Sequence, residues 1–100
     1  MKEEIFNQYV NKITKLFGVT KEELFSKTRQ RNVVDARQLL YYLCFNRLMQ
    51  IVIIKNLMIK NGYNIGHNSI INGIKVVDQK MKEDIDYISV VREIDQSVFI

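Results

Sequence analysis

The chain of 100 residues contains no proline, no tryptophan and a single cysteine, Cys44. One cysteine has no partner for an intrachain disulfide and supplies too few thiolates for a cysteine-based metal cluster. No metal and no other cofactor is expected. There is no low-complexity run and no internal repeat, and the length is that of one ordinary domain, residues 1–100. The loop G-x-x-x-x-G-K-S/T is also absent, so no bound nucleotide is expected.

Long hydrophobic runs are missing as well. The longest apolar region, Ile51–Ile59, is interrupted by Lys55 and Asn56 and is shorter than the ~18–20 apolar residues that span a membrane. Residues 1–4 are acidic and amphipathic, which is not typical of a signal peptide. The sequence therefore predicts a cytoplasmic protein with no membrane partner.

The charge of the chain is small in total but uneven along its length. The net charge is +4, yet residues 1–23 balance four lysines against four glutamates. Residues 24–75 carry eight basic side chains against one acid, Asp35, and residues 76–100 carry six acids against three bases. Two interpretations are open: a polyanionic partner on one face, or a solvated surface of uneven charge.

Apolar spacing and capping residues predict an all-α fold, a compact bundle of five to six helices. Hydrophobic residues make up 47% of the chain, which is enough for a buried core, and no β-type alternation persists. The helices are expected over residues 2–17, 21–26, 35–49, 52–61 and 67–83, with a short last one over residues 85–94 and fraying beyond it.

Local signals set several of these limits. Gly18 stands where a left-handed C-terminal cap is wanted, and Thr20–Glu23 matches a capping box. Lys27–Val34 has no helical stripe and indicates a basic loop, after which Asp35 would cap the next helix. Gly73 inside a helix costs roughly 1 kcal/mol relative to alanine, so close packing against another helix is expected there.

The apolar stripes predict which helix faces are buried. The residues expected to face inward are Ile5, Tyr9, Ile13 and Leu16 in the first helix, and Ile70, Ile74, Val77 and Met81 in the fifth. Tyr41, Tyr42 and Phe45 are assigned to helix packing rather than to a platform for single-stranded nucleic acid. Cys44 is expected to be a small buried hydrophobe.

Two polar stretches suggest a function. Arg29–Gln38 is a basic run that leads into an apolar helix, and Gly66–Ile70 is a polar cluster at the start of a later helix. Helix, turn and helix, with small polar residues opening the second helix, is the order of a DNA-reading helix-turn-helix. Each stretch alone has a simpler interpretation, as a solvated loop or as helix-capping residues. Together they predict binding to double-stranded DNA.

The order of these motifs resembles the C-terminal DNA-binding domain of the bacterial replication initiator DnaA, in the Trp-repressor-like helix-turn-helix group. The resemblance covers about Ile13–Asp84. Three segments carry it: residues 16–24 (LFGVTKEEL), Arg29-x-Arg31-x-Val33-x-x-x-Arg37-Gln38 before an apolar helix, and His67-Asn68-Ser69-Ile70. The family's ATPase module has no counterpart here.

The resemblance implies roles for individual residues. Arg29 matches an arginine that enters the minor groove, where A·T-rich DNA is narrow and strongly negative. Arg37 and Gln38 match residues that grip the phosphate backbone from the first turn of a helix. Charge and placement alone add three supporting phosphate contacts, Lys27, Arg31 and Lys75.

His67, Asn68 and Ser69 match the polar group that faces bases in the major groove. The sequence also departs from the family pattern: Gly66 replaces an acid, Asn68 and Ser69 replace threonines, and Ala36 replaces a proline. These departures bear on the initiator's own recognition sequence more than on DNA binding in general.

The leading hypothesis is a small stand-alone double-stranded-DNA-binding protein. It would act as a transcriptional regulator or as a replication or origin-associated factor, with a phage or mobile element as one source. The alternative is a protein-interaction module on the same scaffold that has lost base reading. Its partner would be a replication or transcription protein or a second copy of the chain, and Gly66 and the acidic C-terminal third favour it. No constellation of acids, bases or nucleophiles indicates an enzyme.

Overall fold

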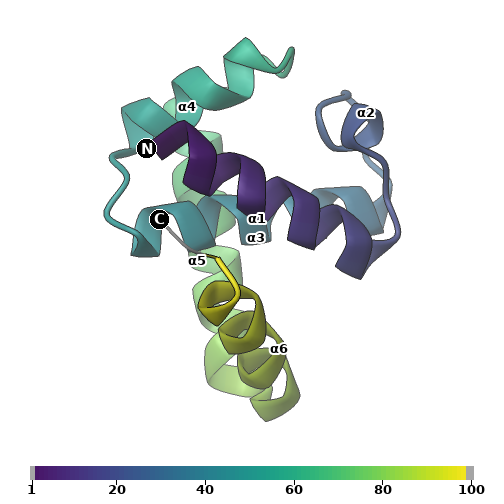
Figure 1. The fold of residues 1–100 in the computed structure, drawn as a ribbon, viewed down its shortest axis with the longest axis vertical. Helices are drawn as coiled ribbons and strands as arrows, with labels where there is room; N and C mark the ends of the chain where they lie inside the picture. Colours follow the sequence, from purple (N-terminus) through teal and green to yellow (C-terminus); the bar gives the residue numbers. More distant parts are fainter. Residues whose placement is uncertain (1, 99–100) are drawn as a thin grey trace.

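Residues 2–98 are described by a computed structural model, and within them all regular structure is helical (Figure 1). The expected all-α fold is confirmed. The helices are α1 (Lys2–Phe17), α2 (Lys21–Leu24), α3 (Arg31–Asn46), α4 (Ile51–Lys60), α5 (His67–Glu83) and α6 (Ile85–Gln96). Among the described residues, no helix combines the length and the apolar character needed to cross a membrane.

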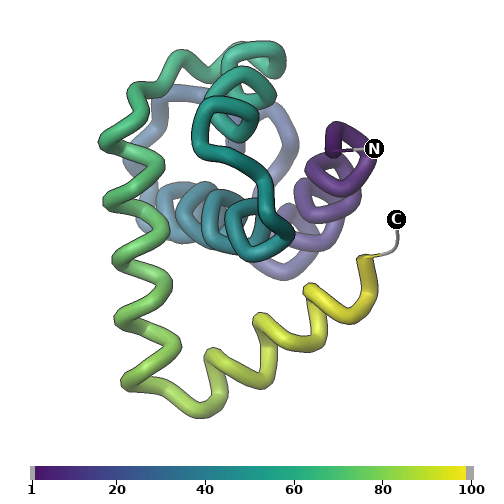
Figure 2. Tube along the Cα trace, turned by 90° about the vertical axis from the view of Figure 1, so that its left-hand side faces the viewer, coloured from purple at the N-terminus to yellow at the C-terminus, as the bar shows by residue number. Residues whose placement is uncertain are grey.

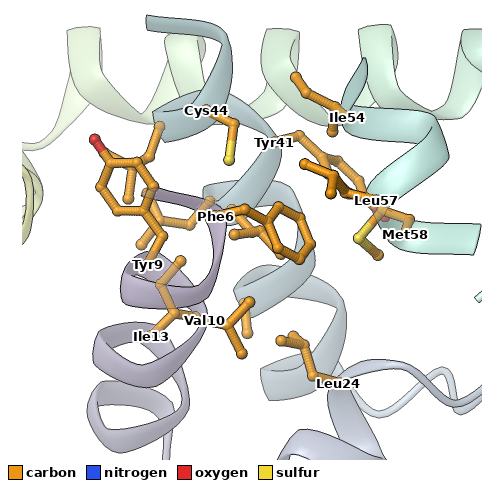
Figure 3. Close-up of a cluster of buried hydrophobic side chains, with 14 of the residues drawn as sticks. Phe6, Tyr9, Val10, Ile13, Leu24, Tyr41, Cys44, Ile54, Leu57 and Met58 are labelled. Carbon is orange, nitrogen blue, oxygen red and sulfur yellow. The ribbon is translucent and has the colours of Figure 1, made fainter. Parts of the chain in front are cut away.

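Helix α3 is the centre of the fold and contacts α1, α2, α4 and α5. Figure 3 shows the core on one side of it, where Phe6 and Tyr9 of α1 lie close to Cys44 and Ile13 lies one turn further along α1. These four side chains are fully buried, as is Ile54 of α4. Burial in this apolar core raises the pKa of the Cys44 thiol, which is therefore protonated.

One residue of the predicted stripe on α1 lies outside the core. Leu16 is 48% exposed, whereas Ile5, Tyr9 and Ile13 are buried as expected. The last turn of α1 extends towards α6, where Leu16 lines a shallow hollow together with Val90. The periodicity of α1 was therefore right, but its final turn faces a neighbouring helix rather than the core.

Helix α3 begins four residues earlier than its sequence suggested. The backbone carbonyl of Gln30 accepts hydrogen bonds from the N–H groups of Val33 (3.1 Å) and Val34 (3.0 Å), without a capping side chain. Val33 is fully buried, so the first turn of α3 belongs to the packed face. Asp35 lies inside the helix, and the prediction that it would cap α3 was wrong.

Helix α3 also ends earlier than expected, because Leu48 adopts a left-handed conformation with φ 65°. The N–H of Met49 donates to the carbonyl of Cys44 (3.2 Å), and that of Leu48 to the carbonyl of Phe45 (3.0 Å). This is the hydrogen-bond pattern of a Schellman motif, in which glycine is usual. A leucine gives no indication of a left-handed turn, so the end of α3 predicted from the sequence is too late.

Helix α6 folds back from the far end of α5 towards α1 (Figure 2). The Tyr9 hydroxyl donates to Asp95 Oδ1, and Arg47 Nη2 donates to the carbonyls of Asp95 (3.0 Å) and Val98 (2.9 Å). Fraying after Asp95 was expected, but these contacts hold the chain to Val98, which is buried. The expectation for residues 99–100 lies outside the described residues.

Helices α4 and α5 are joined by a tight turn over residues 61–66. Gly62 has φ 98°, and its N–H donates to the carbonyl of Ile59 (2.9 Å), while that of Tyr63 donates to the carbonyl of Met58 (3.0 Å). The stop predicted at Gly62 is thus made by a second Schellman motif. The turn brings the start of α5 back beside α3.

The closest approach of α3 and α5 occurs at Gly73. A Cβ atom at this position would lie 2.9 Å from Tyr41 Cδ2 and 3.2 Å from Gln38 Cγ. Tyr41 is only 3% exposed. The close packing expected from a glycine inside α5 is confirmed.

Replacing Leu48 by glycine is expected to raise the free energy of unfolding by about 0.5–1 kcal/mol, because relief of the left-handed strain exceeds the added entropy of the unfolded chain. The side chain is 87% exposed, so little packing is lost. Urea denaturation measures the difference. Leu48→Ala is the matched control, because it removes the same side chain but keeps the strain and should bring no gain.

Gly73→Ala is expected to lower the free energy of unfolding by about 1–2 kcal/mol, because overpacking against Tyr41 outweighs the gain in helix propensity. Asn72→Ala, at the exposed neighbouring position, tests propensity alone and should be neutral or slightly stabilising. Equal stability of the two variants would contradict the close packing.

Candidate nucleic-acid interface

The first turn of α5 presents the predicted base-reading residues to solvent. His67, Asn68 and Ser69 are all exposed. The N-cap of α5 is Gly66, which has no side chain to accept a hydrogen bond from the first turn. The simpler interpretation of Asn68 and Ser69 as N-caps therefore does not hold, and the start of α5 keeps backbone N–H groups available to an acceptor outside the helix.

The basic loop between α2 and α3 lies on the same face as the start of α5. Lys27 and Arg29 are exposed in this loop. Together with Gln38 of α3 and Ser69 of α5 they line a hollow of about 450 Å³. Residues separated by about forty positions in the sequence are thus neighbours around one depression, which also borders the turn before α5 through Asn64.

Arg37 occupies a different place from the one expected. Its side chain is only 5% exposed, and it lies in the second turn of α3 rather than the first, because α3 begins at Arg31. Nε donates to the carbonyl of Leu24 (2.8 Å), and Nη2 donates to the carbonyls of Ser26 and Thr28 (3.1 Å to Thr28). The guanidinium is thus bonded to backbone carbonyls of the protein itself, while Arg37 also borders the hollow. The phosphate contact that the resemblance implied stays a prediction.

The remaining predicted contacts are spread over two elements. Gln38 is half-buried beside the hollow, where its Cγ faces Gly73. Arg31 is exposed at the start of α3, and Lys75 is exposed two turns into α5, on the face that carries Asn68. The structure leaves all three accessible, but only Gln38 borders the hollow.

One residue of this face went unnoticed in the sequence. Asn72 is exposed and follows Asn68 by four positions, so the two amides lie one turn apart on α5. The buried residues of this helix, Ile70, Gly73 and Val77, define the opposite face. Counting from that buried face would have identified Asn72.

The acid Asp35 lies beside Arg31 of this basic face and is held by two cations. Arg31 Nε is 3.6 Å and Lys80 Nζ is 3.4 Å from Asp35 Oδ1, so the carboxylate joins α3 to α5. Lys80 also lies 5.8 Å from the centre of the Tyr87 ring, and burial, with a contribution from Asp35, raises the pKa of Tyr87 to about 12. The phenol is therefore neutral around pH 7.

None of the described residues that line the hollow is acidic. Asp84 and Asp86 stand at the junction of α5 and α6, at the opposite end of α5 from His67 (Figures 1 and 2). The acidic tail thus does not cover the first turn of α5, which remains exposed. The first turn of α5 is therefore free of acids, whereas Asp84 and Asp86 lie where α5 meets α6.

Helix α4, a glycine turn and α5, with an exposed polar first turn beside a basic loop, define a DNA-binding domain of the helix-turn-helix class. Residues 7–61 match the family model described as the bacterial DnaA protein helix-turn-helix. This match covers more than half of the chain, which therefore belongs to that family. The matched residues end before the first turn of α5.

A similar protein is the chromosomal replication initiator protein DnaA 2 of Chlamydia caviae. It is 28% identical over 81 residues, which are 81% of this chain and 17% of that protein. The chain thus spans less than a fifth of the length of this relative. No solved structure matches the chain.

Asp35→Asn is expected to strengthen binding to any duplex, because it removes a negative charge beside Arg31 and releases that guanidinium towards phosphate. The slope of log K against log salt concentration should steepen by about 0.9, the value for one additional phosphate contact. Fluorescence anisotropy at several salt concentrations measures both effects. Asp78→Asn, which removes an exposed acid from the solvent-facing side of α5, is the control, and an equal gain there would indicate net charge alone.

Proposed function

We propose that this domain binds double-stranded DNA sequence-specifically with two elements, the first turn of α5 in the major groove and the basic loop in an adjacent minor groove. One observation carries the proposal: Arg29 of the loop and Ser69 of α5 line the same hollow. A duplex lying across this face meets both elements at once, because major and minor grooves alternate along its surface.

The chemistry of the exposed residues fits a division of labour. Asn68 pairs with adenine through two hydrogen bonds, and His67 and Ser69 add single ones. Arg29 enters the minor groove, where its fixed charge suits the negative potential of A·T-rich DNA. The residues assigned to phosphate contacts are Lys27, Arg31, Gln38 and Lys75.

A replication-associated role is favoured over a purely transcriptional one. The support is the similarity to a chromosomal replication initiator protein together with the family membership of residues 7–61. The inferred role is recognition of a duplex site at which replication is started or controlled.

A second candidate is a protein-interaction module that has kept the scaffold and lost base reading. It is supported by Gly66, which offers no side chain at the start of α5, and by a family match that ends at residue 61. In this case the partner is a replication or transcription protein. Duplex binding with base preference is the property that separates the two candidates.

Titration of labelled duplexes, selected from a random pool, tests the proposal. Three to five phosphate contacts predict a slope of about −3 to −4.5 in a plot of log K against log salt concentration. A flat response, or equal affinity for all duplexes, contradicts sequence-specific binding and favours the interaction module.

Two variants separate the elements. Arg29→Ala should weaken binding and reduce the salt slope by about 0.9, because one phosphate-region contact is lost. Asn68→Ala should relax preference at one base pair at a cost of ~1–3 kcal/mol, with the slope unchanged. Lys12→Ala, an exposed lysine of α1 beside α6, is the charge control and should alter neither quantity.

A further inference from the structure

We infer that Arg37 is a positioning residue: it fixes the basic loop against the turn that precedes α5, and it acts on DNA through these two elements. This inference rests on the proposed function for its effect on DNA affinity. Its structural part concerns the DNA-free protein and can be tested independently.

The long-range hydrogen bonds that the structure describes for the loop all come from Arg37. Among the described residues, its other hydrogen bonds join positions two to four apart, such as Ser26 Oγ to the carbonyl of Glu23 (2.7 Å) and the N–H of Gln30 to Thr28 Oγ1 (3.3 Å). Arg37 reaches the carbonyls of Leu24, Ser26 and Thr28 from a neighbouring helix. These three carbonyls flank Lys27 and precede Arg29. Holding them therefore fixes the backbone positions from which the side chains of Lys27 and Arg29 extend.

The same guanidinium also contacts the helix-turn-helix. Its central carbon lies 4.5 Å from the centre of the Tyr63 ring, which is close enough for a cation–π interaction. Tyr63 belongs to the turn and is tied to α4 through its N–H and the carbonyl of Met58 (3.0 Å). The edge of the guanidinium therefore binds the loop, and its face binds the turn.

This arrangement requires arginine. A guanidinium offers five donors in a plane and stacks on an aromatic ring, whereas a lysine ammonium is a compact point charge. Arg37→Lys thus keeps the positive charge but cannot hold three carbonyls and the ring together. A residue that only gripped phosphate would lose much less on this substitution, because lysine also binds phosphate.

The first experiment uses hydrogen exchange and limited trypsin digestion of the DNA-free protein. In Arg37→Lys, backbone amides of residues 25–30 should exchange about 10- to 100-fold faster relative to those of the α3 core, because buried hydrogen bonds are lost. Cleavage after Lys27 and Arg29 should accelerate in parallel. Unchanged exchange and cleavage would overturn the inference, whatever the protein does with DNA.

Arg47→Lys is the matched control. Arg47 also donates to two backbone carbonyls and lies over a tyrosine ring, 5.7 Å from the centre of Tyr9, but it holds α6. Its replacement should loosen the end of α6 and leave residues 25–30 unchanged. If Arg37→Lys does not fold, Tyr63→Leu keeps the guanidinium and removes only the ring, and it should also accelerate exchange in the loop.

The second experiment measures duplex affinity in a double-mutant cycle. The loss caused by Arg29→Ala should shrink at least about twofold in the Arg37→Lys background, because a loosened loop no longer presents Arg29 at a fixed place. If Arg37→Lys loosens the loop but the losses of duplex affinity from Arg37→Lys and Arg29→Ala are strictly additive, the inferred effect of Arg37 on DNA binding is refuted. Absence of duplex binding by the parent would instead refute the proposed function and leave the exchange result standing.

Discussion

The packing of α3 against α5 at Gly73 is the constraint on which the rest of the fold depends. Only a residue without a side chain allows Tyr41 and Gln38 to approach the axis of α5 this closely. The approach brings the start of α5 beside the loop that precedes α3, because this loop leads directly into α3 and α3 contacts α5. The ion pair between Lys80 and Asp35 joins the two helices further along α5. The packing of the core therefore sets the position of the basic loop relative to the polar first turn of α5.

Much of the fold was predictable because its signals are local. Periodicity gave the bounds of α1 and α5, and Gly18 and Gly62, both with positive φ, marked helix ends as expected. The two ends of α3 were not predictable in the same way. Gln30 caps through its backbone alone, and Leu48 takes a conformation that its side chain disfavours. Both features are set by the surrounding structure rather than by the identity of the residue.

The candidate site was predictable in composition but not in detail. The sequence placed Lys27, Arg29 and Ser69 in two segments, and the fold brings these segments together around one hollow. The burial of Arg37 could not be foreseen, because an arginine within a basic run is typical of an exposed position. Its carbonyl partners come from the end of α2 and the following loop, and their geometry exists only after folding.

The isolation of Cys44 has a practical consequence. The only thiol of the chain is enclosed by the core and held in its protonated, unreactive form, so modifying reagents reach it only when the domain opens. Its rate of alkylation therefore reports opening of the surrounding core without any engineered probe. A second cysteine placed on the exposed surface would react selectively, which allows a spin label or fluorophore to be attached while the native residue stays in place.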